Sequence, residues 1–99
     1  MTNTTRILEA IKAATCQMGP NKGRLLKKSP GYSNPDAAAA WQALTLEANP
    51  YKVSIGAVMM MAPEQREIFE AVRRIVTENH IDVRALDRDR VALESLGVW

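Results

Sequence analysis

Apolar residues recur at helical spacing over residues 62–80, APEQREIFEAVRRIVTENH. Their i, i+1, i+4, i+7, i+8 pattern places them in one stripe along a helix. The stripe consists of Ile68, Phe69, Val72, Ile75 and Val76. Pro63 suits the first helical position, where its missing N–H has no intrahelical partner. The pattern predicts a helix over residues 63–79, and we expect the rest of the chain to pack around it.

A second helical pattern opens the chain. Thr2, Asn3, Thr4 and Thr5 are alternative N-caps, and apolar residues follow at helical spacing as far as Met18. The pair Gly19-Pro20 cannot readily continue a helix. We therefore predict an amphipathic helix over residues 4–18.

Residues 34–48 begin with a strong helix-start signal, Asn34-Pro35-Asp36. Asn is a good cap, Pro suits the first position, and an acidic residue in the first turn interacts favourably with the helix dipole. The following AAAAWQALTLEAN is apolar on most faces, with Trp41 and Leu44 on one side. A helix of this kind is typically buried.

Residues 50–61 allow two readings. Tyr51 to Val58 alternate between apolar and polar residues, which is the strand pattern, whereas Asn49 as cap and Pro50 at the first position favour a helix. A lone strand without a partner cannot satisfy its backbone, so we predict a helix over residues 50–61. A last helix is expected to begin at Asp82 or Asp87 and to stop at Gly97.

These elements predict an all-α fold, a compact bundle of four to five helices in a single domain over residues 1–99. A chain of 99 residues supports one modest core, and 46% hydrophobic with 24% charged residues excludes wholesale disorder. No segment approaches the roughly 18 apolar residues that span a bilayer. Because Cys16 is the single cysteine, no internal disulfide can form. We expect a soluble cytoplasmic protein without membrane contact.

Residues 19–35, GPNKGRLLKKSPGYSNP, form a Gly/Pro-rich connection that we expect to be flexible or irregular. Its cations, without any acid among them, are candidate nucleic-acid contacts. They are Lys22, Arg24, Lys27 and Lys28. A helix-turn-helix would use residues 4–18 as the first helix and residues 21–28 as a short recognition helix. The alternative reading is a solvated basic loop, which is the commoner role of a charge run.

The run Met59, Met60, Met61 is a candidate protein interface, because thioether side chains repack readily around varied partners. Three consecutive helical residues cannot all face one core, so at least one should be exposed, and we expect core filling by two of them. Trp99 at the end of the chain joins this candidate surface, since its ring either folds back onto the core or contacts a partner.

The sequence is poor in catalytic groups. His80 is the single histidine and follows a helix end, where we expect a structural role, and we expect Cys16 to be inert packing. We therefore predict no catalytic triad or nucleophile–base pair, and these residues do not form a zinc ligand pattern. We expect no cofactor and no metal. The sequence predicts a non-enzymatic adapter, inhibitor or regulatory subunit that binds a protein partner through apolar helix surface, with a homodimer as one form. A DNA- or RNA-binding regulator that uses Lys22 to Lys28 is the alternative.

Overall fold

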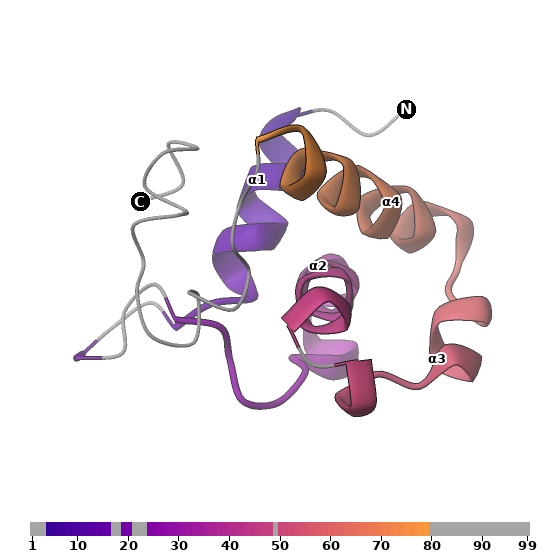
Figure 1. Cartoon of the computed structure of the whole chain (residues 1–99), viewed down its shortest axis with the longest axis horizontal. Coiled ribbons are helices and arrows are strands. Elements are labelled where there is room, and N and C mark those ends of the chain that lie inside the picture. Colours follow the sequence, from indigo (N-terminus) through magenta and orange to yellow (C-terminus); the bar gives the residue numbers. More distant parts are fainter. Residues whose placement is uncertain (1–3, 17–18, 21–23, 49, 80–99) are drawn as a thin grey trace.

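The structure is a computed structural model that describes residues 4–16, 19–20, 24–48 and 50–79 (Figure 1). Within this part of the chain it is helical and contains no strand, which confirms the all-α prediction. The elements are α1 (Thr4–Ala13), η1 (Gly31–Ser33), α2 (Pro35–Ala48), η2 (Pro50–Lys52), α3 (Ile55–Met59) and α4 (Pro63–Glu78). The predicted last helix between Asp82 and Gly97 lies outside the described residues, and so do His80 and Trp99.

The central element is α2, which packs against both α1 and α4 (Figure 1). The expectation that the 63–79 helix would be central was therefore wrong. Half of the residues of α2 are buried, on several faces of the helix: Ala37, Ala39, Ala40, Trp41, Ala43, Leu44 and Thr45. The start signal of α2 acts as predicted, because Asn34 Oδ1 accepts a hydrogen bond of 3.1 Å from the Ala37 N–H.

The helix α4 confirms the prediction over residues 63–79 almost to its ends. Its apolar stripe is buried, with Ile68 and Val72 fully inaccessible to solvent, and it packs onto α2. Burying one such aliphatic side chain contributes about 1.5–3 kcal/mol, so the stripe is a major source of stability. The described helices are too short or too polar to span a bilayer.

The first helix is shorter than predicted, because α1 ends at Ala13. Beyond it Thr15 forms an antiparallel bridge with Leu25. The Cys16 N–H donates to the Arg24 carbonyl at 2.8 Å, and the Leu26 N–H donates to the Ala14 carbonyl at 3.1 Å. These bonds replace the helical ones, and they bring Leu25 into the core.

The predicted helix over residues 50–61 is divided in two. After the short turn η2, Ser54 has extended backbone angles and caps α3, its Oγ accepting from the Ala57 N–H at 3.4 Å. The α-helix then covers only Ile55–Met59. A helix was the right class of element here, but its predicted length was wrong, and the strand alternative is not formed.

Candidate functional site

An open groove of about 640 Å³ lies between α2 and α3. Four segments line it: residues 29–31, the first half of α2, residues 57–62, and Gln65 near the start of α4. None of the described lining residues is charged, and most of the lining surface that they form is apolar. A concave, mainly apolar surface of this size is the usual form of a binding site.

The methionines form one wall of the groove. Met60 is 87% exposed and Met61 packs partly against the core, and both line the groove. Met59 is 70% exposed and does not line it. The prediction that at least one of the three is exposed is confirmed, whereas core filling by two of them was wrong. The reason is that α3 turns only one side toward the core, through Val58 and then Met61.

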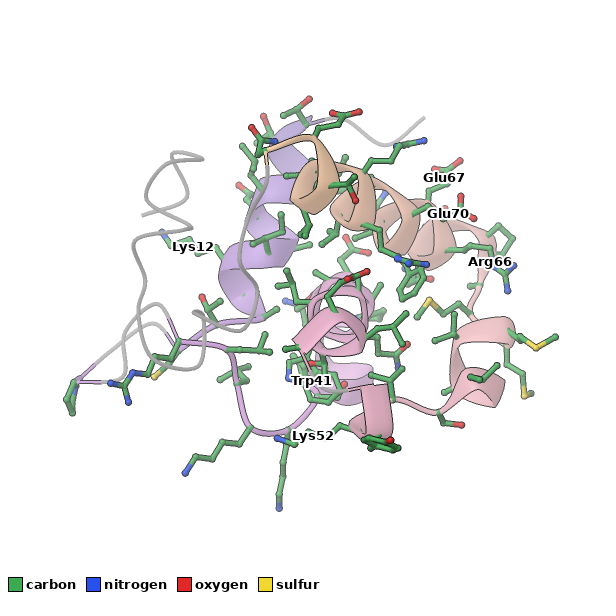
Figure 2. All side chains as sticks on the ribbon, viewed as in Figure 1. Lys12, Trp41, Lys52, Arg66, Glu67 and Glu70 are labelled. Atoms are coloured by element: carbon green, nitrogen blue, oxygen red, sulfur yellow. The ribbon has the colours of Figure 1, made fainter. Side chains whose placement is uncertain are left out.

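Arg66 fixes this wall to α4. Figure 2 shows its side chain reaching from the beginning of α4 toward α3. Its Nη2 donates to the Val58 carbonyl at 3.2 Å and to the Met59 carbonyl at 2.9 Å. The last carbonyls of a helix have no intrahelical donor, so a cation at this position satisfies them and complements the helix dipole. The five-residue helix α3 is thereby held by a side chain from outside.

The opposite wall is built from small residues of α2. Ala38 and Ala39 give it a low profile, and Gln42 adds an amide. The Gln42 Oε1 atom is buried and has no hydrogen-bond partner within the described residues. An unpaired buried acceptor is unfavourable by about 1–3 kcal/mol, so the groove wall carries an unused hydrogen-bonding group.

The rim at residues 29–31 depends on a tight turn. Gly31 has φ 68°, a left-handed angle that favours glycine. Its N–H donates to Ser29 Oγ at 3.1 Å, and Ser33 Oγ donates to the Pro30 carbonyl at 2.8 Å. These local bonds shape the backbone that closes the groove beside α2.

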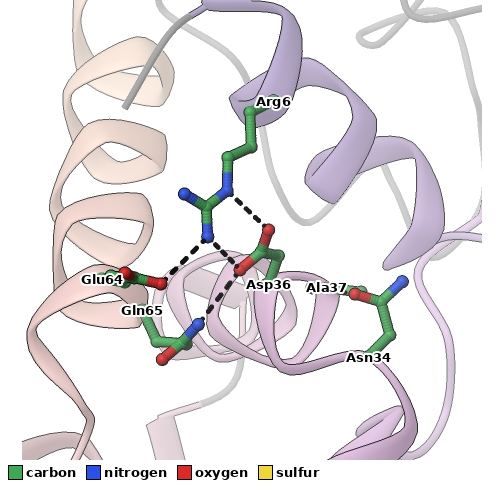
Figure 3. Close-up of polar contacts among 6 residues, drawn as sticks. All are labelled: Arg6, Asn34, Asp36, Ala37, Glu64 and Gln65. Atoms are coloured by element: carbon green, nitrogen blue, oxygen red, sulfur yellow. Dashed lines mark hydrogen bonds and ion pairs between the residues drawn. The ribbon is translucent and has the colours of Figure 1, made fainter. Parts of the chain in front are cut away.

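A polar cluster joins the beginnings of three helices near Gln65 (Figure 3). Asp36 of α2 accepts hydrogen bonds from Arg6 Nε at 2.7 Å, from Arg6 Nη2 at 2.9 Å and from Gln65 Nε2 at 3.1 Å. Glu64 lies 3.6 Å from Arg6 Nη2. The hydrogen bond from Arg6 lowers the pKa of Asp36, against the opposing effect of burial. The cluster positions α4 relative to α2 and so fixes the width of the groove at this end.

The predicted nucleic-acid contacts are not among the lining residues of the groove, although Lys27 and Lys28 directly precede its rim at Ser29 in the sequence. Arg24, Lys27 and Lys28 are exposed, and Lys22 lies outside the described residues. Residues 24–28 contain no helix, because Leu25 bridges to Thr15 and Trp41 Nε1 donates to the Leu26 carbonyl at 2.7 Å. The proposed recognition helix over 21–28 is therefore not formed in its described part, and the first helix of that motif is too short.

Side chains of the metal-binding and catalytic types do not cluster elsewhere in the described part of the chain. No group of three or more His, Cys, Asp or Glu residues there is arranged to hold a metal ion. Cys16 is partly buried beside the bridge. A second hollow, of about 350 Å³, is lined among the described residues by α4 alone, with residues such as Arg74 and Glu78.

Sequence reasoning found the methionines of the groove but missed its α2 wall. In the sequence, Ala38, Ala39 and Gln42 resemble ordinary positions of a buried helix. The signal for a hollow is the small size of Ala38 and Ala39, which lie opposite a tight turn. Comparisons of the chain with protein-family models, with curated proteins and with solved structures find no match. Its function is therefore inferred from its own surface chemistry.

Proposed function

We propose that this chain is a non-enzymatic protein-binding module whose binding site is the groove between α2 and α3. The observation that carries the proposal is the concentration of exposed apolar side chains in and just before residues 57–62, the segment that lines one wall of the groove. Within the described residues, the large exposed hydrophobic side chains all fall between residues 51 and 60: Tyr51 at 98%, Ile55 at 73%, Met59 at 70% and Met60 at 87%. Apolar surface concentrated in this way typically marks an interaction site.

The extent of this surface favours a macromolecular partner over a small molecule. A small-molecule site encloses most of its ligand and directs several polar groups at it. Here the polar lining is sparse, and exposed apolar residues such as Met59 continue beyond the groove. Methionine also suits a surface that adapts to a partner. An adapter, inhibitor or regulatory subunit acts through a surface of this kind.

The experiment compares Met60→Gln with Met59→Gln as baits for affinity capture, both with nuclease. Both residues are exposed methionines in the same turn, but only Met60 lines the groove. We expect Met60→Gln to weaken capture of a specific protein by about tenfold, the effect of losing one buried Met contact, and Met59→Gln to weaken it much less. Equal capture by wild type and both variants would contradict the proposal.

The basic segment supports a second candidate function, a DNA- or RNA-binding regulator. Arg24, Lys27 and Lys28 are exposed, and residues 24–35 contain no acid. Binding through these cations requires contacts to the phosphate backbone, because the segment offers no recognition helix in its described part. A mobility-shift assay with duplex and single-stranded oligonucleotides at two salt concentrations tests it. Binding that persists after changing Lys22, Arg24, Lys27 and Lys28 to Ala rules it out.

A further inference from the structure

We infer that the occupant of the groove is an amphipathic helix of a partner protein, with an apolar stripe flanked by acidic residues. This inference rests on the proposed function and specifies the chemistry of the partner. It follows from two observations: the kind of element that the walls can accept, and the sign of the charges beside them.

The walls of the groove fit a helix better than an extended peptide. Strand addition requires an open sheet edge, and the described residues contain only the single Thr15–Leu25 bridge. Polyproline ligands require an aromatic-lined groove, whereas the described lining side chains include no aromatic one. A helix presents apolar side chains at i, i+3, i+4 and i+7, which suit a groove between α2 and α3 with alanines in one wall and methionines in the other.

Three lysines that lie close in sequence to the groove lining have no acidic partner within the described residues. Lys27 and Lys28 directly precede the rim at Ser29, and Lys52 is the only charged residue between 50 and 62. None of these three lysines takes part in an ion pair within the described residues. By contrast, the acids nearest to the groove, Asp36 and Glu64, both contact Arg6. Complementarity therefore requires negative charge on the occupant, at the side that faces Lys27 and Lys28.

A second copy of the chain does not meet this requirement. An isologous dimer through the groove would place the same lysines on both sides of the interface, where like charges repel. The described helix with most exposed acids, α4, already buries its apolar stripe against α2. No described segment is both acidic and apolar on a free face, so no described segment of a second copy fits the groove.

The test uses fluorescein-labelled helical peptides and the full chain, read by fluorescence anisotropy at about 50 mM and about 300 mM NaCl. The probe is a lactam-bridged peptide of about 16 residues, with Leu at i, i+3, i+4 and i+7 spacing and Glu on the flanks. One control peptide carries Lys in place of Glu, and another has a scrambled order that destroys the stripe. We expect the acidic peptide to bind at least about tenfold more tightly than either control, and less tightly at high salt.

Two variants of the chain make the result specific. Met60→Gln should weaken binding of the acidic peptide by about tenfold, and Met59→Gln is its matched control. Lys27→Glu combined with Lys28→Glu changes no lining residue and should reverse the preference toward the Lys peptide. Because both lysines are exposed, thermal unfolding of this variant should match wild type, which shows that the reversal is not a loss of fold.

The outcomes separate this inference from the proposed function. Equal binding of the acidic and basic peptides, with both weakened by Met60→Gln, overturns the acidic partner and leaves the groove as a protein site. No peptide binding, together with equal capture by Met60→Gln and Met59→Gln baits, overturns both. A concentration-dependent dimer abolished by Met60→Gln in sedimentation assigns the groove to a second copy. If oligonucleotides displace the acidic peptide, and do so equally well in the wild type and in Met60→Gln, the surface is assigned to nucleic acid.

Discussion

The carboxylate of Asp36 connects three helices, through Arg6 of α1, its own place in α2 and Gln65 of α4. Because the hydrogen bond from Arg6 stabilises the charged form, the folded-state pKa of Asp36 lies below the ordinary value of 3.8. A carboxylate with a lowered pKa stabilises the fold above its unfolded-state pKa and loses that effect as the pH falls through the folded-state pKa. The cluster is partly exposed, so solvent screening reduces its effect.

Asp36→Asn should therefore destabilise the protein in a pH-dependent way. At pH 7 we expect Tm to fall by roughly 5 °C, and at an acidic pH well below 3.8 we expect a smaller difference, because wild-type Asp36 becomes protonated as the pH falls through its lowered pKa. Thermal unfolding followed by circular dichroism at both pH values gives the measurement. Glu47→Gln, which alters the exposed pair of Glu47 with Arg73, is the control and should shift Tm less. An equal loss at both pH values would contradict this account.

Replacing Thr45 should stabilise the protein, whereas replacing Asp36 should destabilise it. Its side chain is 2% exposed, and its Oγ1 has no hydrogen-bond partner within the described residues. Thr45→Val replaces the hydroxyl with a methyl group of similar shape and removes an unpaired buried polar group. We expect the free energy of unfolding in urea to rise by about 1 kcal/mol. A decrease of the same size would show that the hydroxyl is satisfied in solution.

At the scale of elements, the sequence predicted the starts of α2 and α4, but it missed the end of α1 and the start of α3. Asn34-Pro35 marks the start of α2, and Pro63 marks the start of α4. The end of α1 at Ala13 depends on Leu25, which is distant in sequence and pairs with Thr15. Similarly, Ser54 is a strong cap, but the alternating residues around it concealed a break between η2 and α3. Local pattern therefore determines these starts, and tertiary contacts determine the ends.

The short helix α3 should depend on Arg66 for its order. Arg66→Met keeps the apolar stem but removes the donors to the Val58 and Met59 carbonyls. We expect the amides of Val58 and Met60 to exchange hydrogen faster by roughly threefold to tenfold, with little change in global Tm, because only local opening is favoured. Arg74→Met is the matched control, because Arg74 is exposed on α4, the helix that also carries Arg66. Unchanged exchange in Arg66→Met would mean that core contacts alone hold α3.

At the scale of the molecule, the groove arises from the meeting of segments that are far apart in the sequence. Met60 was predictable as a candidate contact because a run of three methionines cannot all be buried. The wall at Ala38 and Gln42, and the rim at Gly31, were not predictable, since their roles exist only once η1 and α3 lie against α2. The site thus results from the packing of other segments around α2, and α1 and α4 also pack against α2.

Overpacking α2 should therefore disturb both the fold and the groove. Ala40 is fully buried in the core, within one turn of Ala38 and Ala39 in the groove wall. Ala40→Leu adds three carbon atoms where close packing leaves no room, so we expect the free energy of unfolding to fall by about 1–3 kcal/mol. In the proposed peptide assay the same variant should bind the acidic helix more weakly, because α2 must shift to admit the larger side chain. Ala57→Leu, at an exposed position of α3, should change stability by less than about 0.5 kcal/mol. If Ala40→Leu unfolds in urea at the same midpoint as wild type, the interior around α2 is looser than this packing implies.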